Sequence, residues 1–259
     1  MRKRLFFIVW IVIGHLVLFA QDSLQTKRIW SNGTAYTLPH GRFEIGFFQP
    51  LRFGLKDNLE LSVQPLLFFV MPNATVKWGQ SKDVATRHSF YYPTQLLRMA
   101  SKEGTGGLIS PEFDIPHMFA LRNDVLYTKR FFDNQFFTMM AGLEFAVRFG
   151  SLDERTTIDF PWVYNRLAVF YNDFGIRLGL DWYGKISGDW WFRLNGELFY
   201  YSGNNQAKAF EHNGKIYWRH KGKWEVSAGY NIIYGEYPYG SEWNWFVPII
   251  DVRYAWNGK

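Results

Sequence analysis

Large apolar side chains recur at every second position along this chain, over segments about twice as long as ordinary strands. In the clearest segment, 190–200, the even-numbered positions carry Trp, Phe, Leu, Leu and Tyr, and only Gly196 interrupts them. The odd-numbered positions from 191 to 197 carry Trp, Arg, Asn and Glu. Residues two apart share one face of a β-strand, whereas a helix repeats every 3.6 residues, so the pattern predicts a two-faced strand. The same alternation occupies 137–148, 175–183, 224–232 and 250–256.

The alternation leaves open which face meets water, and two all-β architectures compete. One is a soluble sandwich with the apolar face inside, and the other is a membrane barrel with that face outside. Strands of soluble proteins have about 5 or 6 residues, whereas a tilted membrane strand needs roughly 9 to 11, which is the length found here. The polar face carries acids and bases in similar numbers, as a narrow lumen lined by paired charges requires. The candidate lumen charges are Glu44, Arg52, Glu60, Glu144, Arg148, Arg177, Asp181, Arg193, Glu197, Glu225, Asp251 and Arg253.

Aromatic residues make up 20% of the chain, and many lie near the ends of the alternating segments. Outer-membrane barrels carry such aromatic girdles at both membrane interfaces. Beyond residue 20 the longest wholly apolar run is 66–71, far short of the roughly 18 residues that indicate a membrane helix. Only helices and closed barrels satisfy their backbone polar groups in lipid. We therefore expect an all-β protein, a single antiparallel transmembrane β-barrel.

The N-terminus has the composition of an export signal. Three basic residues at positions 2–4 precede an apolar stretch at 5–19, and Ala20 offers a cleavage point. We interpret 1–20 as a secretory signal peptide and 21–259 as the barrel domain. The alternative is an uncleaved anchor helix, although a spanning helix needs roughly 20 apolar residues. The chain contains no Cys, so no lipid-modified N-terminus, disulfide framework or thiolate metal site is expected.

Turn lengths allow the strands to be counted. Short connections are expected at 54–58, 130–134, 184–188 and 220–223, and longer ones at 93–116, 150–163, 201–206 and 235–243. Outer-membrane barrels keep short turns on the periplasmic side, so the number of strands between two short turns must be even. An upward strand at 28–38 and a downward strand at 42–53 complete a barrel of twelve strands, with ten as the alternative. The other expected strands are 58–69, 74–80, 86–92, 117–129, 135–149, 164–183, 189–200, 207–219, 224–234 and 244–256.

The segment 52–61 reads Arg-Phe-Gly-Leu-Lys-Asp-Asn-Leu-Glu-Leu. It resembles the aromatic-Gly-Leu-x-Asp-x-Leu-Glu-Leu hairpin of Gram-negative outer-membrane barrels, both transporter-like and uncharacterised ones, in which Gly and Asp-Asn suit a tight turn. The resemblance implies export to the outer membrane. The expected partners are the lipid bilayer, lipopolysaccharide and the outer-membrane insertion machinery, and no substrate is implied. The chain departs from this class at its end, where Asn-Gly-Lys follows Trp256 although such barrels often end on an aromatic residue.

The segment 93–116 lacks the alternation. Pro93 ends the preceding strand, 95–100 is able to form one or two helical turns, and a Gly-Thr-Gly-Gly run follows at 104–107. Connections of this length commonly have a function. One interpretation is a loop that folds into the lumen as a constriction, and the other is an external cap or a disordered excursion. The candidate constriction residues are Arg98, Lys102 and Glu103.

We expect no catalytic residues, no cofactor and no metal site. His88-Ser89 is the nearest approach to a hydrolase pair, but adjacent residues of a strand point to opposite faces. The formal net charge is +6, and three of the 29 basic residues belong to the signal segment, so the mature chain is weakly basic. Nucleic acid is therefore not expected as a partner.

Two classes of function remain, and a lipid-modifying enzyme at the barrel rim is a distant third. The first is a narrow pore or transporter for small polar or amphiphilic solutes. The second is a closed barrel with a structural, adhesive or assembly role, its lumen filled by ion pairs and by aromatics such as Phe48, Tyr183 and Trp191. A twelve-stranded barrel is intermediate in width between barrels filled by side chains and open porins, so width does not decide between them. Transport is the favoured interpretation.

Overall fold

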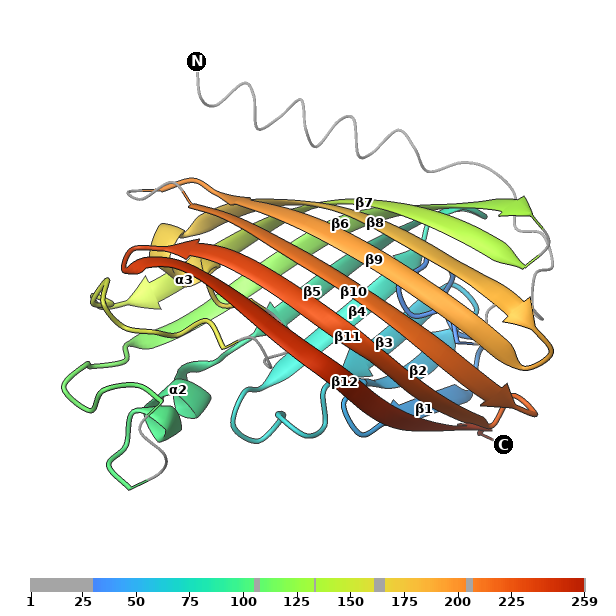
Figure 1. The fold of residues 1–259 in the computed structure, drawn as a ribbon, viewed down its shortest axis with the longest axis horizontal. Helices are drawn as coiled ribbons and strands as arrows, with labels where there is room; N and C mark the ends of the chain where they lie inside the picture. The colour runs from blue at the N-terminus through green and yellow to red at the C-terminus, as the bar shows by residue number, and fades with distance from the viewer. Residues whose placement is uncertain (1–29, 105–107, 133, 161–165, 204–206, 259) are drawn as a thin grey trace, which may run out of the picture.

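The computed structural model describes residues 30–104, 108–132, 134–160, 166–203 and 207–258. These residues form twelve antiparallel strands, each paired with its neighbours in the chain, and β1 closes the sheet against β12 (Figure 1). The predicted twelve-stranded barrel is thus confirmed, while the predicted signal peptide lies outside the described residues. The strands are β1 Arg42–Gly46, β2 Leu51–Lys56, β3 Leu59–Val63, β4 Asn73–Gly79, β5 Val84–Tyr91, β6 His117–Phe132, β7 Gln135–Phe149, β8 Phe174–Ser187, β9 Trp190–Tyr201, β10 Ala207–His220, β11 Trp224–Tyr237 and β12 Gly240–Asn257.

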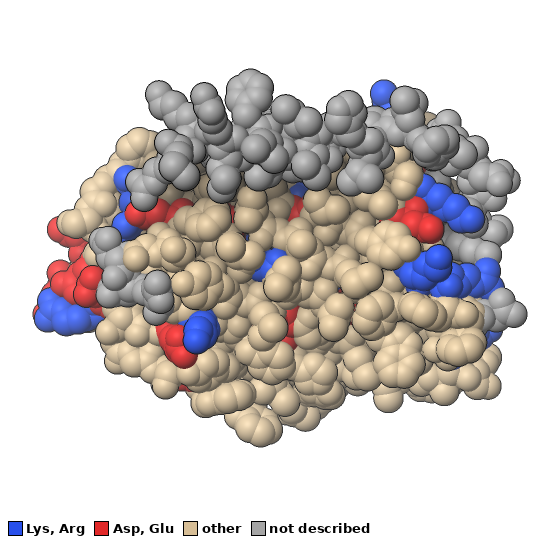
Figure 2. All heavy atoms as spheres, turned by 90° about the horizontal axis from the view of Figure 1, so that it is seen from above, with Lys and Arg blue, Asp and Glu red and all other residues tan. Residues whose placement is uncertain are grey.

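The apolar face of the sheet is the outer one. On β8, Leu178 and Leu180 are exposed, whereas Arg177 and Asp181 are buried. A protein dissolved in water buries the opposite set, so this wall is built to face lipid. Figure 2 shows that charged side chains lie mainly toward the two ends of the visible face, and that other residues form most of the surface between them. Of the two predicted architectures, the membrane barrel is therefore confirmed and the soluble sandwich is wrong.

The two ends of the barrel differ. Arg42 of β1 pairs with Asn257 of β12 at one end, where connections such as 57–58, 188–189 and 221–223 are short. At the other end lie α2 (Thr94–Ala100), α3 (Val169–Asn172) and the long connections that carry them (Figure 1). Short turns mark the periplasmic end of an outer-membrane barrel, so the helices lie at the extracellular end. Among the described residues, no helix is long and apolar enough to cross a membrane.

The strands are of very unequal length. β1, β2 and β3 have 5, 6 and 5 residues, whereas β12 has 18. All three short strands have one end at the periplasmic end of the barrel. β1 begins there, at the pair Arg42 and Asn257, and β2 turns into β3 there, at residues 57–58. The wall formed by β1 to β3 is therefore low, and the wall formed by β6 to β12 is tall.

The strand predicted at 28–38 is wrong where the structure describes it, because residues 30–39 form turns inside the barrel. Carboxylates on the barrel wall accept hydrogen bonds from backbone N–H groups of this segment. Trp30 donates to the Glu44 carboxylate at 3.0 Å, and Leu38 donates to the Glu60 carboxylate at 2.9 Å. The segment predicted as one strand at 42–53 forms both β1 and β2, and this extra strand keeps the total at twelve.

Three further boundaries differ from prediction. The strand expected at 164–183 begins only at Phe174, because α3 occupies the preceding residues, so the connection from β7 extends over 150–173. The loop expected at 235–243 is replaced by a tight hairpin between Tyr237 and Gly240. The strand expected at 58–69 ends at Val63, and residues 64–72 form turns.

Candidate functional site

A cavity of about 510 Å³ lies within the barrel. Its lining mixes apolar side chains, four asparagines, and more basic than acidic groups. The acids in the lining are Glu197 and Glu211. The basic residues in the described lining are Arg87, Arg122, Arg166, Arg177, Arg193 and Lys215. Five of the six basic residues also pair with carboxylates, most of which do not line the cavity.

The predicted lumen charges occupy three kinds of position. Arg177, Arg193 and Glu197 line the cavity. Arg148 lies at the extracellular rim, where it pairs with the largely exposed Asp173 at 2.8 Å, and it does not line the cavity. The other predicted charges are buried in the barrel interior, and they are Glu44, Arg52, Glu60, Glu144, Asp181, Glu225, Asp251 and Arg253.

Arg52 is the centre of a buried charge network near the periplasmic end. Its Nη1 donates to Glu44 at 2.8 Å, and its Nε and Nη2 donate to the two carboxylate oxygens of Glu60, each at 2.8 Å. Arg42 also donates to Glu44 at 3.0 Å, and Lys77 lies 3.3 Å from Glu60. Such fork-shaped, charge-assisted contacts fix the geometry of both carboxylates. The network ties β1, β2, β3 and β4 together from inside.

A second network joins the strands on the other side of the barrel closure. Glu225 of β11 accepts from Arg219 of β10 at 2.6 Å and lies 2.8 Å from Nε of Arg253 of β12. Asp181 of β8 pairs with Arg193 of β9. Each of these carboxylates lies beside a cation on a neighbouring strand, which reduces the cost of burying both charges.

A third network surrounds the cavity at mid-height. Asp124 lies between Arg87 at 2.7 Å and Arg177 at 3.3 Å, and Arg177 also pairs with Glu197. Glu144 is bound by Arg122 at 2.6 Å, and nearby the hydroxyl of Tyr91 donates to it at the same distance. The basic residues here have partners and also present part of their surface to the cavity.

Residues 30–39, here called the N-terminal plug, fill the periplasmic part of the lumen. The Trp30 ring lies between cations, with the guanidinium carbons of Arg253 and Arg42 at 4.7 and 5.2 Å from its centre. Such cation–π contacts strengthen when they are shielded from water. Ala35 donates its N–H to the Thr128 hydroxyl on β6 at 2.7 Å, which anchors the plug to the opposite wall.

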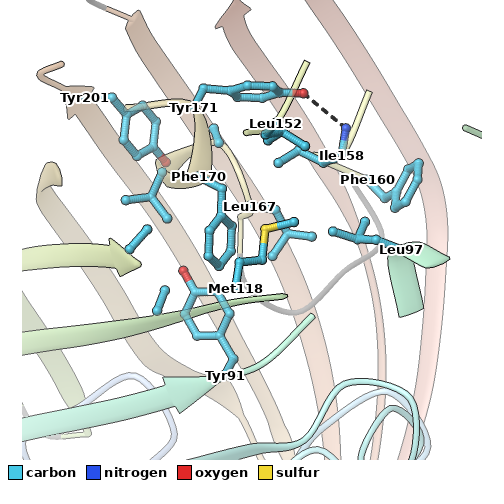
Figure 3. Close-up of a cluster of buried hydrophobic side chains, with 14 of the residues drawn as sticks. Tyr91, Leu97, Met118, Leu152, Ile158, Phe160, Leu167, Phe170, Tyr171 and Tyr201 are labelled. Carbon is cyan, nitrogen blue, oxygen red and sulfur yellow. Dashed lines mark hydrogen bonds between the residues drawn. The ribbon is translucent and has the colours of Figure 1, made fainter. Parts of the chain in front are cut away.

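Packed apolar side chains from the 92–116 and 150–173 connections and the adjoining strands lie in the extracellular part of the barrel, and are here called the loop cluster. In Figure 3, Phe170 and Leu167 from the 150–173 connection point toward Met118 of β6 and Tyr91 of β5. The backbone N–H of Ile158 donates to the Tyr171 hydroxyl at 3.1 Å, so polar contacts also hold this connection. The sequence analysis did not predict an apolar core from the 92–116 and 150–173 connections, because their residues lack a regular period.

Arg166 anchors the loop cluster to the charged lumen below it. Its guanidinium pairs with Asp159 at 2.9 Å and lies 3.5 Å from Glu211 of β10. Burial alone would lower the pKa of Arg166, but the neighbouring Asp159 carboxylate outweighs it and raises the pKa above its ordinary value. Arg166 therefore stays charged and holds the connection over the cavity.

The candidate constriction residues do not line the cavity. Arg98 on α2 is exposed and donates to the Ile115 carbonyl at 2.9 Å, and Lys102 and Glu103 are exposed beside it. All three border a separate depression on the outside of the extracellular end. The helical turns predicted at 95–100 do form, and they bury Leu97 in the loop cluster. Narrowing of the lumen comes instead from the N-terminal plug and the loop cluster.

The sequence analysis missed several residues of the cavity. Lys215, Asn213 and Asn231 all line it, and the first two lie on the inner face of β10. Their alternation with outward-facing residues was available in the sequence, but the glycine and histidine within 211–214 obscured it. Arg166 lay within a segment predicted as a strand and could not be placed by periodicity.

No family model matches the chain, and no curated protein matches it. Solved structures do match at low identity. An outer membrane channel from Pseudomonas putida F1 has a TM-score of 0.47 at 9% identity, covering 86% of this chain and 98% of that one. A structure titled bacterial polysaccharide outer membrane secretin has a TM-score of 0.46 at 9% identity, with coverage of 84% and 70%. A FadL homologue from Pseudomonas aeruginosa has a TM-score of 0.34 at 11% identity, with coverage of 83% and 66%.

The architecture itself shows which kind of fold the chain has. Its first strand pairs with its last to close the barrel, its outer wall is apolar, and most of its charges are buried inside. A wall of this kind is stable in lipid and not in water, because only there are both faces matched to their surroundings. The protein therefore has the fold of an outer-membrane β-barrel.

Proposed function

We propose that this barrel passes small polar or amphiphilic solutes across the outer membrane, with a preference for anions. The observation that carries the proposal is the central cavity, in which six basic residues face two acidic ones within the described lining. Five of these six cations pair with carboxylates, but most of those carboxylates do not line the cavity, so its surface presents more cationic donors than acids. A surface of this kind is suited to binding anions.

The two plugs determine how passage would occur. The N-terminal plug and the loop cluster lie on opposite sides of the cavity, toward the two ends of the barrel. Both are held by contacts that are reversible in principle, namely hydrogen bonds to wall carboxylates and apolar packing between loops. Passage then requires displacement of each plug in turn, which makes the protein a transporter-like channel with infrequent opening.

The alternative is a closed barrel with a structural, adhesive or assembly role, and the same two plugs favour it. An enzymatic role has less support. His88 faces outward and bonds to Asn123 at 2.8 Å, whereas Ser89 faces inward and bonds to Thr75 at 2.9 Å. The two side chains therefore lie on opposite faces of β5 and cannot act on one substrate.

Planar-bilayer conductance of refolded protein tests the proposal. Two chains are compared, one starting at residue 21 and one starting at residue 40, which lacks the N-terminal plug. We expect rare small steps from the first chain and larger, more frequent, anion-selective steps from the second. Because removal of the plug could impair folding, a milder variant carrying Trp30→Ala and Leu38→Ala is measured in parallel. Heat-modifiable migration on gels establishes that each variant is folded.

The variant Lys102→Gln with Glu103→Gln is the control, since both residues lie outside the cavity. Its conductance and selectivity should equal those of the wild type. Folded barrels that remain electrically silent after loss of the plug would contradict the transport proposal and favour the closed, structural role. Steps that are cation-selective would contradict the assignment of an anionic solute.

A further inference from the structure

The low wall formed by β1 to β3 is too short to cross the membrane. A strand of five residues, rising about 3.3 Å per residue at a tilt of about 40°, spans only ~13 Å along the membrane normal. The apolar band of an outer-membrane barrel is about 25 Å tall. Since these strands start from the periplasmic end, the extracellular half of the band has no paired strand at this point of the wall.

The neighbouring strand β12 is left with an unpaired edge as a result. Its residues Arg253 to Asn257 pair with β1, but among the described residues Gly240 to Ile250 pair with β11 alone. The ladder stops because the Asp251 carboxylate accepts the backbone N–H groups of Phe47 and Phe48, at 3.0 and 3.1 Å, and turns the chain into the β1–β2 connection. Open sheet edges at membrane depth occur only where protein buries them or where they line a cavity.

The central cavity extends to this edge. Its lining includes Phe48 from the β1–β2 connection and Phe246, Pro248, Ile249 and Ile250 from β12. Ile250 faces outward and is 58% exposed, so a cavity that it helps to line reaches the lipid-facing surface. Prolines within sheets are confined to edges and bulges because they have no N–H to donate, and Pro248 lies at the bulge between the pairs Gly229–Ile249 and Asn231–Phe246.

Polar groups without a partner lie just inside the apolar edge. Lys215 lies in register with Gly229 and, through it, with Ile249, and it makes no hydrogen bond or ion pair with any described residue. The Asn231 side chain lines the same part of the cavity, and its buried Oδ1 has no hydrogen-bond partner among them. The ammonium group beside an apolar slot suits an amphiphile with an anionic head, whereas the Asn231 oxygen is an acceptor and does not itself bind an anion.

We propose that the cavity takes in an anionic amphiphile sideways from the membrane, past the unpaired edge of β12. The head group, a carboxylate, sulfonate or phosphate, is bound by the Lys215 ammonium. The apolar tail lies against Phe48, Phe246 and Pro248 and extends toward the lipid. This inference rests on the proposed function and adds a substrate class and a route to it.

Photolabelling tests the inference. The probe is a long-chain carboxylate with a diazirine near its methyl end, and its matched control is the corresponding alcohol. The full mature barrel is reconstituted in phosphatidylcholine vesicles, labelled and mapped by peptide mass spectrometry. We expect label from the carboxylate on 47–50 and 245–250. Lys215→Gln should reduce this labelling about tenfold, because a bond to a charged group is lost, whereas Lys215→Arg should retain it.

Lys208→Gln serves as the control variant, because Lys208 lies on the same strand but is exposed. Adding phosphatidylglycerol distinguishes two sources of the anion: competition assigns the site to lipid head groups, and unchanged labelling assigns it to free amphiphiles. Equal labelling by the alcohol, or label spread evenly around the outer wall, would overturn the inference. Conductance after loss of the N-terminal plug is measured with Lys215 unchanged, so a failure here can be told apart from failure of the proposed function.

Discussion

Replacement of Arg52 is expected to be the most damaging single change to the barrel wall. Arg52→Met removes three charge-assisted hydrogen bonds, one to Glu44 and two to Glu60, each of 2.8 Å. Both carboxylates are buried, so each would lose a partner without gaining water. Breaking a buried ion pair on one side commonly costs about 3 to 5 kcal/mol of the free energy of unfolding.

Other contacts limit the loss. Glu44 keeps Arg42, and Glu60 keeps Lys77, so neither carboxylate is left without a cation. We therefore expect a loss near the lower end of that range, about 3 kcal/mol. Arg52→Lys retains the positive charge but not the fork that reaches both acids, and should lose about half as much. A change of this size would unfold a large fraction of a marginally stable barrel.

The assay is urea-induced unfolding of the barrel in lipid vesicles, followed by fluorescence of the 11 Trp residues in 21–259. Arg155→Met is the matched control, because Arg155 also pairs with a carboxylate, that of Asp153, but in an exposed loop. Exposed pairs contribute little, so this variant should unfold like the wild type. A loss below about 1 kcal/mol for Arg52→Met, or equal losses for the two variants, would refute the view that the buried network holds β1 to β3 in place.

Three further substitutions test the N-terminal plug and the loop cluster separately from the barrel wall. A side chain at Gly54 would clash with the Pro39 carbonyl, so Gly54→Ala should loosen the N-terminal plug, seen as faster protease cleavage within 30–39 with little change in heat-modifiable migration. Phe170 is fully buried in the loop cluster, so Phe170→Ala should expose the 150–173 connection to protease while the barrel stays folded; coincident unfolding of both would contradict separate stability. Asp159→Asn leaves the buried Arg166 without its nearest carboxylate and should raise channel opening in planar bilayers, whereas unchanged opening would mean that this pair does not hold the loop cluster closed.

The plugs explain how a barrel of this width can carry charges and yet be closed. Ion pairs satisfy most of the charged groups on the inner face of the wall. Much of the space inside the barrel is filled by the N-terminal plug and by the connections that carry the loop cluster, which are not part of the wall. The N-terminal plug uses the same carboxylates that tie the short strands together, since Glu44 and Glu60 each accept a plug N–H as well as arginine donors. Displacement of the plug therefore perturbs the low side of the wall, next to the unpaired edge of β12.

Alternation in the sequence determined the membrane barrel and most of its tall wall. Strands such as β7 and β9 were predicted nearly to the residue. The alternation of outward apolar and inward polar side chains is a local property of each strand, so it can be read without knowing which strand is its neighbour. The inward charges followed from the same rule. The resemblance at 52–61 marked a turn that the structure retains between β2 and β3.

Only the tertiary structure decided what fills and opens the barrel. Residues 30–39 resemble a strand in sequence, but their N–H groups bind carboxylates on the wall, and β1 ends because of Asp251, about two hundred residues away in the chain. The 150–173 connection builds an apolar core from irregularly spaced residues, which no periodic pattern reveals. Lys215 has significance only because three strands in register bring it beside the unpaired edge of β12. Periodicity records which face a side chain takes, but partners contributed by distant segments are fixed only when the barrel closes.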